Sequence, residues 1–208
     1  KVLDVKEKNL SLFFKPYLPE IDVKKLRLSS NNDFSFKISK KFKFDDFKLD
    51  TKVSIDEFSI INKFNLKKFL PNIKESLNFL DHKLSIKYSK DNLNIIGKGS
   101  VLLQEKNDTF TYSINKKNNI LNLKTSLNID DNPFKIDFLN YKKDEKKDAL
   151  LQLELSKNIK NQFFVKSFSI KEEKNIIKFK NLALNEKLEI IKLGAINLDY
   201  IDTEKQKN

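Results

Sequence analysis

Every second residue is apolar through most of the stretch from Asn92 to Leu155. A period of two places the apolar side chains on one face of a β-strand and the polar ones on the other. Polar segments rich in Lys, Asn and Asp separate the runs, at 105–108, 116–119, 130–133 and 142–148. The stretch therefore predicts an antiparallel meander with one apolar face.

The apolar residues of these runs are the candidate lining residues of that face. They are Ile95, Val101, Leu103, Phe110, Tyr112, Ile114, Leu121, Leu123, Leu127, Ile129, Phe134, Ile136, Phe138, Leu151, Leu153 and Leu155. The set is made of Leu, Ile, Val and aromatic residues, without a convergent group of charges.

Alternation of the same kind continues at 22–60, from Leu84 to Tyr88, and at 163–200, where it changes parity several times, as expected for bulges. One segment has a different period. Phe69, Leu70, Ile73, Leu77 and Leu80 recur at steps of three and four residues, and Pro71 suits the first turn of a helix. The sequence thus predicts a mainly β chain with one short amphipathic helix, from about Pro71 to Leu80.

The chain reads as one unit, because no stretch rich in Gly, Pro or Ser separates two parts. We expect a single β segment over residues 1–208, with 1–64 and 65–208 as the one subdivision that the change of period offers. There is no methionine among the 208 residues, so we also expect the chain to be an internal segment of a longer protein.

Charge points to an anionic partner or to nothing more than a lysine-rich surface. The formal net charge is +12, but the basic residues are almost all lysines, and Arg27 is the only arginine. Nucleic-acid readers depend on arginine for bidentate and stacking contacts. The lysines are also spread along the chain between acidic residues. We therefore expect no nucleic-acid partner.

The residues offer little chemistry for catalysis. Cysteine is absent, and three glycines cannot supply a phosphate-binding loop. The lone histidine, His82, follows the predicted helix and is expected to cap it or to lie on the surface. Acidic pairs such as Asp130 and Asp131 fall in predicted turns. We expect no enzymatic activity, no catalytic residue, no cofactor and no metal site.

The apolar face must be shielded from water, and the sequence pattern is compatible with several kinds of cover. A second sheet would give a β-sandwich or a closed barrel, and the chain would then be a non-enzymatic binding or structural module of the cell envelope. A lipid or another protein could cover the face instead. One short helix is too small to do so.

Three segments resemble the AsmA-like superfamily, in its YhdP-type branch, which is related to TamB. The first is Phe69-Leu70-Pro71-Asn72-Ile73-Lys74, and the second is Leu93-Asn94-Ile95-Ile96-Gly97-Lys98-Gly99. The third runs from Asn132 to Phe138 and is followed, after a polar gap, by Leu150-Leu151-Gln152-Leu153. The resemblance covers roughly Leu49 to Tyr200 and depends more on pattern than on fixed residues.

This resemblance implies a long, twisted antiparallel meander curled into an apolar groove. Proteins of this superfamily are anchored in the inner membrane of Gram-negative bacteria and cross the periplasm. They are thought to carry phospholipid between the inner and outer membranes, with acyl chains in the groove. The implied partners are phospholipid acyl chains, neighbouring groove segments of the same protein, and the inner membrane, reached through a segment outside this chain.

Overall fold

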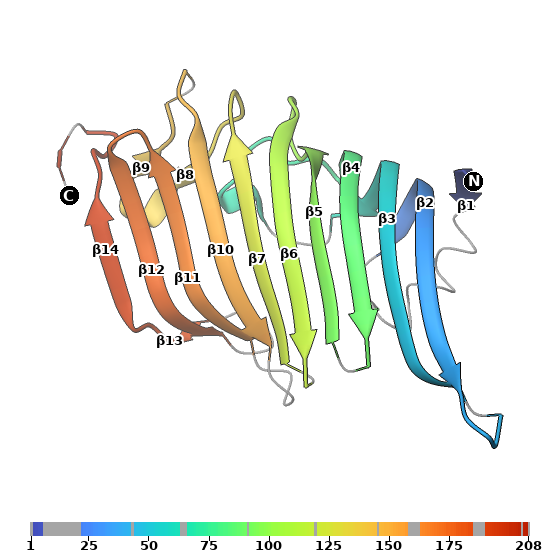
Figure 1. Cartoon of the computed structure of the whole chain (residues 1–208). Helices are drawn as coiled ribbons and strands as arrows, with labels where there is room; N and C mark the ends of the chain where they lie inside the picture. The colour runs from blue at the N-terminus through green and yellow to red at the C-terminus, as the bar shows by residue number, and fades with distance from the viewer. Residues whose placement is uncertain are drawn as a thin grey trace.

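The computed structural model describes most of the chain, in ten ranges: 2–5, 22–42, 44–62, 66–90, 92–118, 120–144, 146–157, 163–184, 190–204 and 206–207. Twelve strands of these ranges form one sheet, and two more form a small hairpin on one of its faces (Figure 1). The strands are β1 (Val2–Val5), β2 (Val23–Ile38), β3 (Phe44–Ile61), β4 (Ser76–Ser89), β5 (Asn92–Leu102), β6 (Asp108–Lys117), β7 (Ile120–Ile129), β8 (Lys135–Ile136), β9 (Tyr141–Lys142), β10 (Ala149–Lys157), β11 (Phe163–Glu172), β12 (Asn175–Leu184), β13 (Ile190–Lys192) and β14 (Ala195–Asp199).

The large sheet is an antiparallel meander, as the alternation predicted. Its order is β1-β2-β3-β4-β5-β6-β7-β10-β11-β12-β13, and β14 pairs with β12 next to β13. Chain neighbours are sheet neighbours up to β13 except between β7 and β10, where the segment carrying β8 and β9 is inserted. β13 and β14 both pair with β12 and not with each other. In the described part of the chain the sheet does not close on itself, and no second sheet of comparable size packs on it.

The register places the apolar residues of successive strands side by side. Opposite residues in an antiparallel pair point to the same face of the sheet. Cross-strand partners follow one another in a row through seven strands, which we call the open row: Ile86, Ile95, Ile114, Leu123, Leu155, Val165 and Leu182. We call the face that carries this row the apolar face.

A second layer covers only one end of the apolar face. It consists of the inserted segment between β7 and β10, with its 3-10 turn η2 (Asp137–Leu139), and of the loop that contains the 3-10 turn η1 (Leu66–Lys68). Both lie on one face of the sheet, near the upper ends of the strands in Figure 1. Leu70, Phe134, Ile136 and Tyr141 of this layer pack on sheet residues such as Ile129 to form the main core.

The predicted helix at 71–80 is wrong. Ser76 to Leu80 are the first residues of strand β4, and Ser76 pairs with Ile61 of β3. Leu70 and Ile73 belong to the loop before β4 and enter the core from there. Leu70 and Ile73 are core residues of the loop, and Leu77 is the first buried residue of β4. The steps of three and four residues between them resemble a helical period although no helix forms. The two helices described, η1 and η2, have three residues each, and neither is long enough to cross a membrane.

The run from Phe134 to Phe138 is not a strand of the meander. Only Lys135 and Ile136 are extended, and they pair with Tyr141 and Lys142 in the small hairpin. Asn140 takes a left-handed conformation with φ 53° and ends the η2 turn. Alternation over five residues was too short to distinguish a strand of the sheet from a hairpin that lies on it.

Candidate functional site

The candidate site is the part of the apolar face that the second layer leaves uncovered. Along the open row, Ile95, Ile114, Leu123 and Leu155 are all half-buried, and no other layer of the described chain lies over them. The neighbouring row toward the covered end includes Leu84, Gly97, Tyr112, Thr125, Leu153 and Phe168. The apolar face is therefore continuous across the sheet, with one end closed and the other open.

Two hollows lie on this open part and adjoin each other. The first has a volume of about 330 Å³ and is lined by Ile55, Phe58, Phe79, His82, Phe110, Tyr112, Ile114, Leu123 and Thr125. The second has a volume of about 310 Å³ and is lined by Leu26, Leu28, Ser30, Asn32, Val53, Ile55, Phe58, Leu84 and Ile86. Because both share Ile55 and Phe58, they form one shallow apolar trough that runs across β2 to β7.

Two glycines of β5 make room for the aromatic floor of this trough. A Cβ atom on Gly99 would lie 2.3 Å from Cδ2 of His82, and one on Gly97 would lie 2.3 Å from Cζ of Tyr112. The rings of His82 and Tyr112 come from β4 and β6 on either side, and they stack with centroids 5.7 Å apart. Glycine at both positions thus lets two rings lie over the backbone of β5.

His82 is part of this floor rather than a surface residue, so the expectation of a capping or exposed histidine is wrong. Its side chain is 2 % exposed, and Nε2 lies 2.9 Å from the carbonyl oxygen of Ser100. Because a carbonyl only accepts, Nε2 carries the proton and donates it. Burial lowers the pKa of His82 below its ordinary value, against the opposing effects of the Ser100 hydrogen bond and of Asp81. The ring is therefore neutral at physiological pH.

The rim of the open end combines apolar and basic side chains. Beyond the open row, cross-strand partners run Leu93, Lys116, Leu121 and Lys157. Lys116 and Lys157 share the face of Leu121 because both pair with it directly. Two positive charges thus flank an apolar residue where the apolar face ends.

The opposite, outer face of the sheet is polar. A hollow on it is lined by residues that include Lys83, Lys98, Thr111, Ser113 and Lys124. Lys124 forms an ion pair of 3.2 Å with Glu154 on the neighbouring strand β10. The contrast between the two faces is the one that the alternation predicted.

The covering layer is held by polar residues at its base. Gln104, which is fully buried, accepts a hydrogen bond from the backbone N–H of Asn72 at 3.1 Å and donates one to the carbonyl of Pro133 at 2.9 Å. Glu172 accepts hydrogen bonds from the Tyr141 hydroxyl at 3.0 Å and from the N–H of Asp144 at 2.7 Å. These contacts fix the η1 loop and the insertion over one end of the apolar face.

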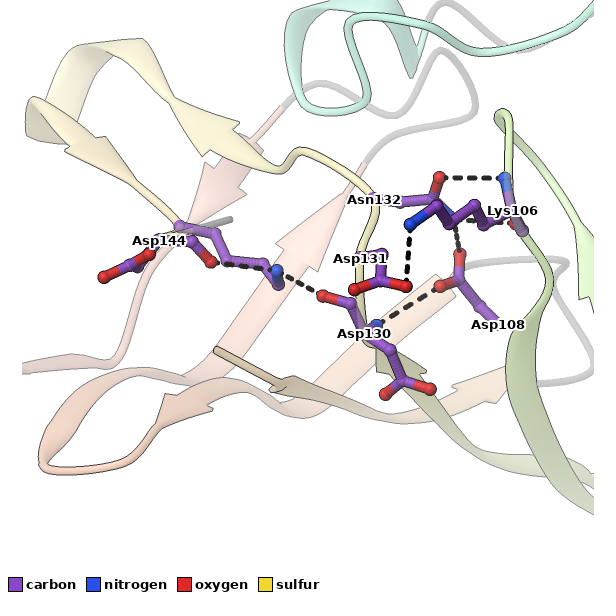
Figure 2. A network of polar contacts seen from close by, with 7 residues as sticks. Lys106, Asp108, Asp130, Asp131, Asn132 and Asp144 are labelled. Carbon is purple, nitrogen blue, oxygen red and sulfur yellow. Dashed lines mark hydrogen bonds and ion pairs between the residues drawn. The ribbon is translucent and has the colours of Figure 1, made fainter. Parts of the chain in front are cut away.

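A buried network around Asp108 joins the start of β6 to the start of the insertion (Figure 2). Asp108 accepts a hydrogen bond from the side-chain amide of Asn132 at 2.8 Å, and Asn132 also bonds both the N–H and the carbonyl of Lys106. Burial raises the pKa of Asp108 to about 6, while its hydrogen bonds from Asn132 and Asp130 oppose the rise. The Nζ of Lys143 donates to the carbonyls of Asp130 and Asp144.

The polar groups of this network bond to one another, so its role is to hold the insertion on the sheet; we call it the polar clasp. Every buried polar side-chain atom in the described ranges has a hydrogen-bond partner. Those ranges also contain no group of three His, Asp or Glu side chains arranged to hold a metal ion.

The structure divides the candidate lining residues into three groups. Eight lie on the open part of the apolar face: Ile95, Phe110, Tyr112, Ile114, Leu121, Leu123, Leu153 and Leu155. Five lie under or beside the second layer: Val101, Leu103, Leu127, Ile129 and Leu151. The other three belong to the insertion, where Phe134 and Ile136 are buried in the core and Phe138 is 73 % exposed. None of these three lies on a strand of the large sheet.

Sequence reasoning missed the contribution of the earlier strands to the trough. Ile55, Phe58, Phe79, His82 and Ile86 line it, although none was selected. The signal for Leu84 and Ile86 was present, since they alternate like the later runs. His82 and Phe79 were hidden by a bulge, because the register shifts between Leu80 and Lys83 and places both rings on the same face.

Comparisons with known proteins add no family to this description. No protein-family model, no curated protein and no solved structure matches the chain.

Proposed function

We propose that this chain is a segment of a bridge-like lipid-transport protein whose open apolar face shields the acyl chains of phospholipids. The observation that carries the proposal is the open row, in which apolar side chains from seven neighbouring strands form one continuous surface that is half-buried except at Val165, which is buried. A continuous apolar surface of this kind on a water-exposed protein favours an apolar partner.

The composition of the trough suits an acyl chain that slides along it. Its lining is mostly aliphatic and aromatic, with Ser30, Asn32 and Thr125 as the uncharged polar residues. His82 presents a neutral ring whose Nε2 is already bonded to Ser100. An acyl chain of about sixteen carbons gains roughly 13 kcal/mol on complete transfer from water, at about 0.8 kcal/mol for each CH₂ group. A surface that covers one side of the chain supplies about half of this. That is enough to hold a chain without fixing it at one position.

The open part of the apolar face suits the acyl chains of a phospholipid, and its rim suits the headgroup. Lys116 and Lys157 flank Leu121 at the open rim, where the phosphate of a headgroup would meet positive charge. The covered end is closed by the insertion and offers no such exit. In this arrangement acyl chains lie along the open part and headgroups stay at the rim in water.

The resemblance to the AsmA-like superfamily extends the proposal to the cellular compartment and to the adjoining segments of the protein. It places the segment in the periplasm of a Gram-negative bacterium, in a protein anchored at the inner membrane. The large sheet does not close within the described ranges. Its outermost strands therefore offer backbone groups to which adjoining groove segments of the same protein would pair.

Two adjacent residues test the proposal with opposite expectations. Ile95 lies on the apolar face, and Ile96, which is 55 % exposed, lies on the outer face. We expect native mass spectrometry of the purified chain to show bound phospholipid. We expect Ile95→Asp to lose it because a carboxylate beside the acyl chain must be desolvated. Ile96→Asp makes the same chemical change in water and should retain the lipid.

Two results would contradict this function. One is a lipid-free wild-type chain that unfolds cooperatively. The other is equal lipid loss in Ile95→Asp and Ile96→Asp, which would mean that the bound lipid does not lie on the apolar face. Co-purification of a protein in place of lipid, lost in Ile95→Asp alone, would assign the face to a protein partner.

A further inference from the structure

The β2–β3 hairpin extends past the rest of the sheet at the open end of the apolar face. β2 and β3 have 16 and 18 residues, and the last partner that β4 offers β3 is Ser89, opposite Lys48. Beyond that pair, residues 36–38 and 44–47 form a two-stranded ribbon with which no third strand of the described ranges pairs, at the lower right of Figure 1. At about 3.4 Å per residue the ribbon projects roughly 17 Å.

The projecting ribbon and its base carry an unusual number of exposed apolar side chains. Of the fifteen large apolar side chains that are exposed in the described ranges, six gather at this corner: Phe34, Phe36, Ile38, Phe42, Phe47 and Tyr88. Phe42 is 89 % exposed at the very tip, and its φ of 54° is rare for a bulky residue. Nothing within the described ranges buries this ring, so its apolar surface is available to a partner.

The same hairpin is basic. Residues 37–48 contain five lysines and two aspartates, and one lysine, Lys37, is paired with Asp46 at 2.5 Å. At the same end of the sheet, Lys90 lies in the turn after β4 and Lys117 is the last residue of β6. A projection of aromatic and aliphatic side chains between lysines fits the interface of a membrane, where rings enter the acyl boundary and ammonium groups meet lipid phosphates.

We infer that the tip of the β2–β3 hairpin docks the open end of the sheet on an anionic lipid bilayer. Phe36, Ile38 and Phe42 enter the interface, and Lys40 and Lys41 remain at the level of the phosphates. The aliphatic Ile38, and the mutual stacking of Phe34 on Phe36 at 6.3 Å and 7°, favour a bilayer over single-stranded nucleic acid, which needs separate rings for its bases. The inference does not require that the apolar face itself carries lipid.

Tryptophan fluorescence gives a direct test, because the chain contains no tryptophan. Phe42→Trp places a single reporter at the tip, and Phe138→Trp places one on another exposed phenylalanine, in the insertion and away from the hairpin. With vesicles of phosphatidylcholine and phosphatidylglycerol, we expect a blue shift at position 42 and quenching by lipids brominated in their acyl chains. Position 138 should show neither effect.

Vesicle co-sedimentation of the tryptophan-free chain measures how much the hairpin contributes. We expect Phe36→Ser with Phe42→Ser to weaken binding at least about tenfold, because two buried rings are lost. Replacing Lys40 or Lys41 by Gln should weaken it about fivefold each, with the effect disappearing on phosphatidylcholine alone. Ile96→Asp, at an exposed residue of the outer face that belongs neither to the hairpin nor to the apolar face, should bind vesicles like the wild type.

Several outcomes would overturn the inference. Equal quenching at positions 42 and 138, or unchanged binding of the Phe36 and Phe42 double variant, would show that the hairpin does not dock. A blue shift at position 42 with a single-stranded oligonucleotide but not with vesicles would assign the tip to nucleic acid. A shift that follows protein concentration without vesicles would assign it to a contact between copies of this chain.

Discussion

Ile136→Ala is expected to lower the free energy of unfolding by about 2–5 kcal/mol, the range for removing a large aliphatic side chain from a packed core. Ile136 is 2 % exposed and packs with Phe134, Tyr141 and the sheet residue Ile129. The neighbouring polar clasp around Asp108 and Gln104 holds the insertion in place, so the cavity left by the deletion cannot easily collapse. Urea unfolding followed by circular dichroism measures the loss.

Phe138→Ala provides a matched control in the same insertion. Phe138 is 73 % exposed, and its replacement should change the free energy of unfolding by no more than about 0.5 kcal/mol. A loss for Phe138→Ala as large as that for Ile136→Ala would mean that the insertion packs on the sheet through the opposite side. An unchanged stability for Ile136→Ala would mean that the cover is not part of the cooperative core.

Gly99→Ala is the second substitution for which we expect a large effect. The added Cβ would lie 2.3 Å from Cδ2 and 2.4 Å from Cγ of His82. These atoms are near the base of a ring that is held by the hydrogen bond from Nε2 to Ser100, so the ring cannot swing aside freely. Overpacking of this kind typically costs about 1–3 kcal/mol. Thermal or urea unfolding should show a loss in the upper part of that range.

Two further variants distinguish the contact with His82 from a general destabilising effect of alanine in β5. Gly97→Ala meets the far end of the Tyr112 side chain, which moves more easily, so the loss should be smaller. In a His82→Ala background, Gly99→Ala should cost almost nothing, because the ring it collides with is gone. An equal cost of Gly99→Ala with and without His82 would contradict the packing of His82 over β5.

The alternation was sufficient to predict the architecture because a sheet with one wet face repeats the same signal in every strand. It placed β5, β6, β7 and β10 and the faces that their side chains take. The long row of apolar partners follows from that pattern once each turn joins neighbouring strands. The segments before and after, β2 to β4 and β11 to β14, continue the same meander.

The second layer could not be predicted in the same way, because its residues follow neither period. Leu70 and Ile73 enter the core from a loop, and Phe134 and Ile136 enter it from a two-residue strand pair. Gln104, Asn132 and Lys143 are polar and read as surface residues, yet each is almost fully buried by partners far away in the sequence. The residues on the open part could therefore not be predicted without knowing how much of the apolar face the second layer covers.

Methyl NMR with a spin-labelled phospholipid tests the central claim most directly, because it locates the acyl chain against individual side chains. We expect a label on the acyl chain to broaden the methyl signals of Ile95, Ile114 and Leu123 on the open part of the apolar face. Ile96 and Ile176, which are exposed on the outer face, and Ile129, which lies beneath the insertion, should keep their signals. Broadening of Ile96 and Ile176 as strong as that of Ile95 and Leu123, or no broadening of any of them, would contradict the account.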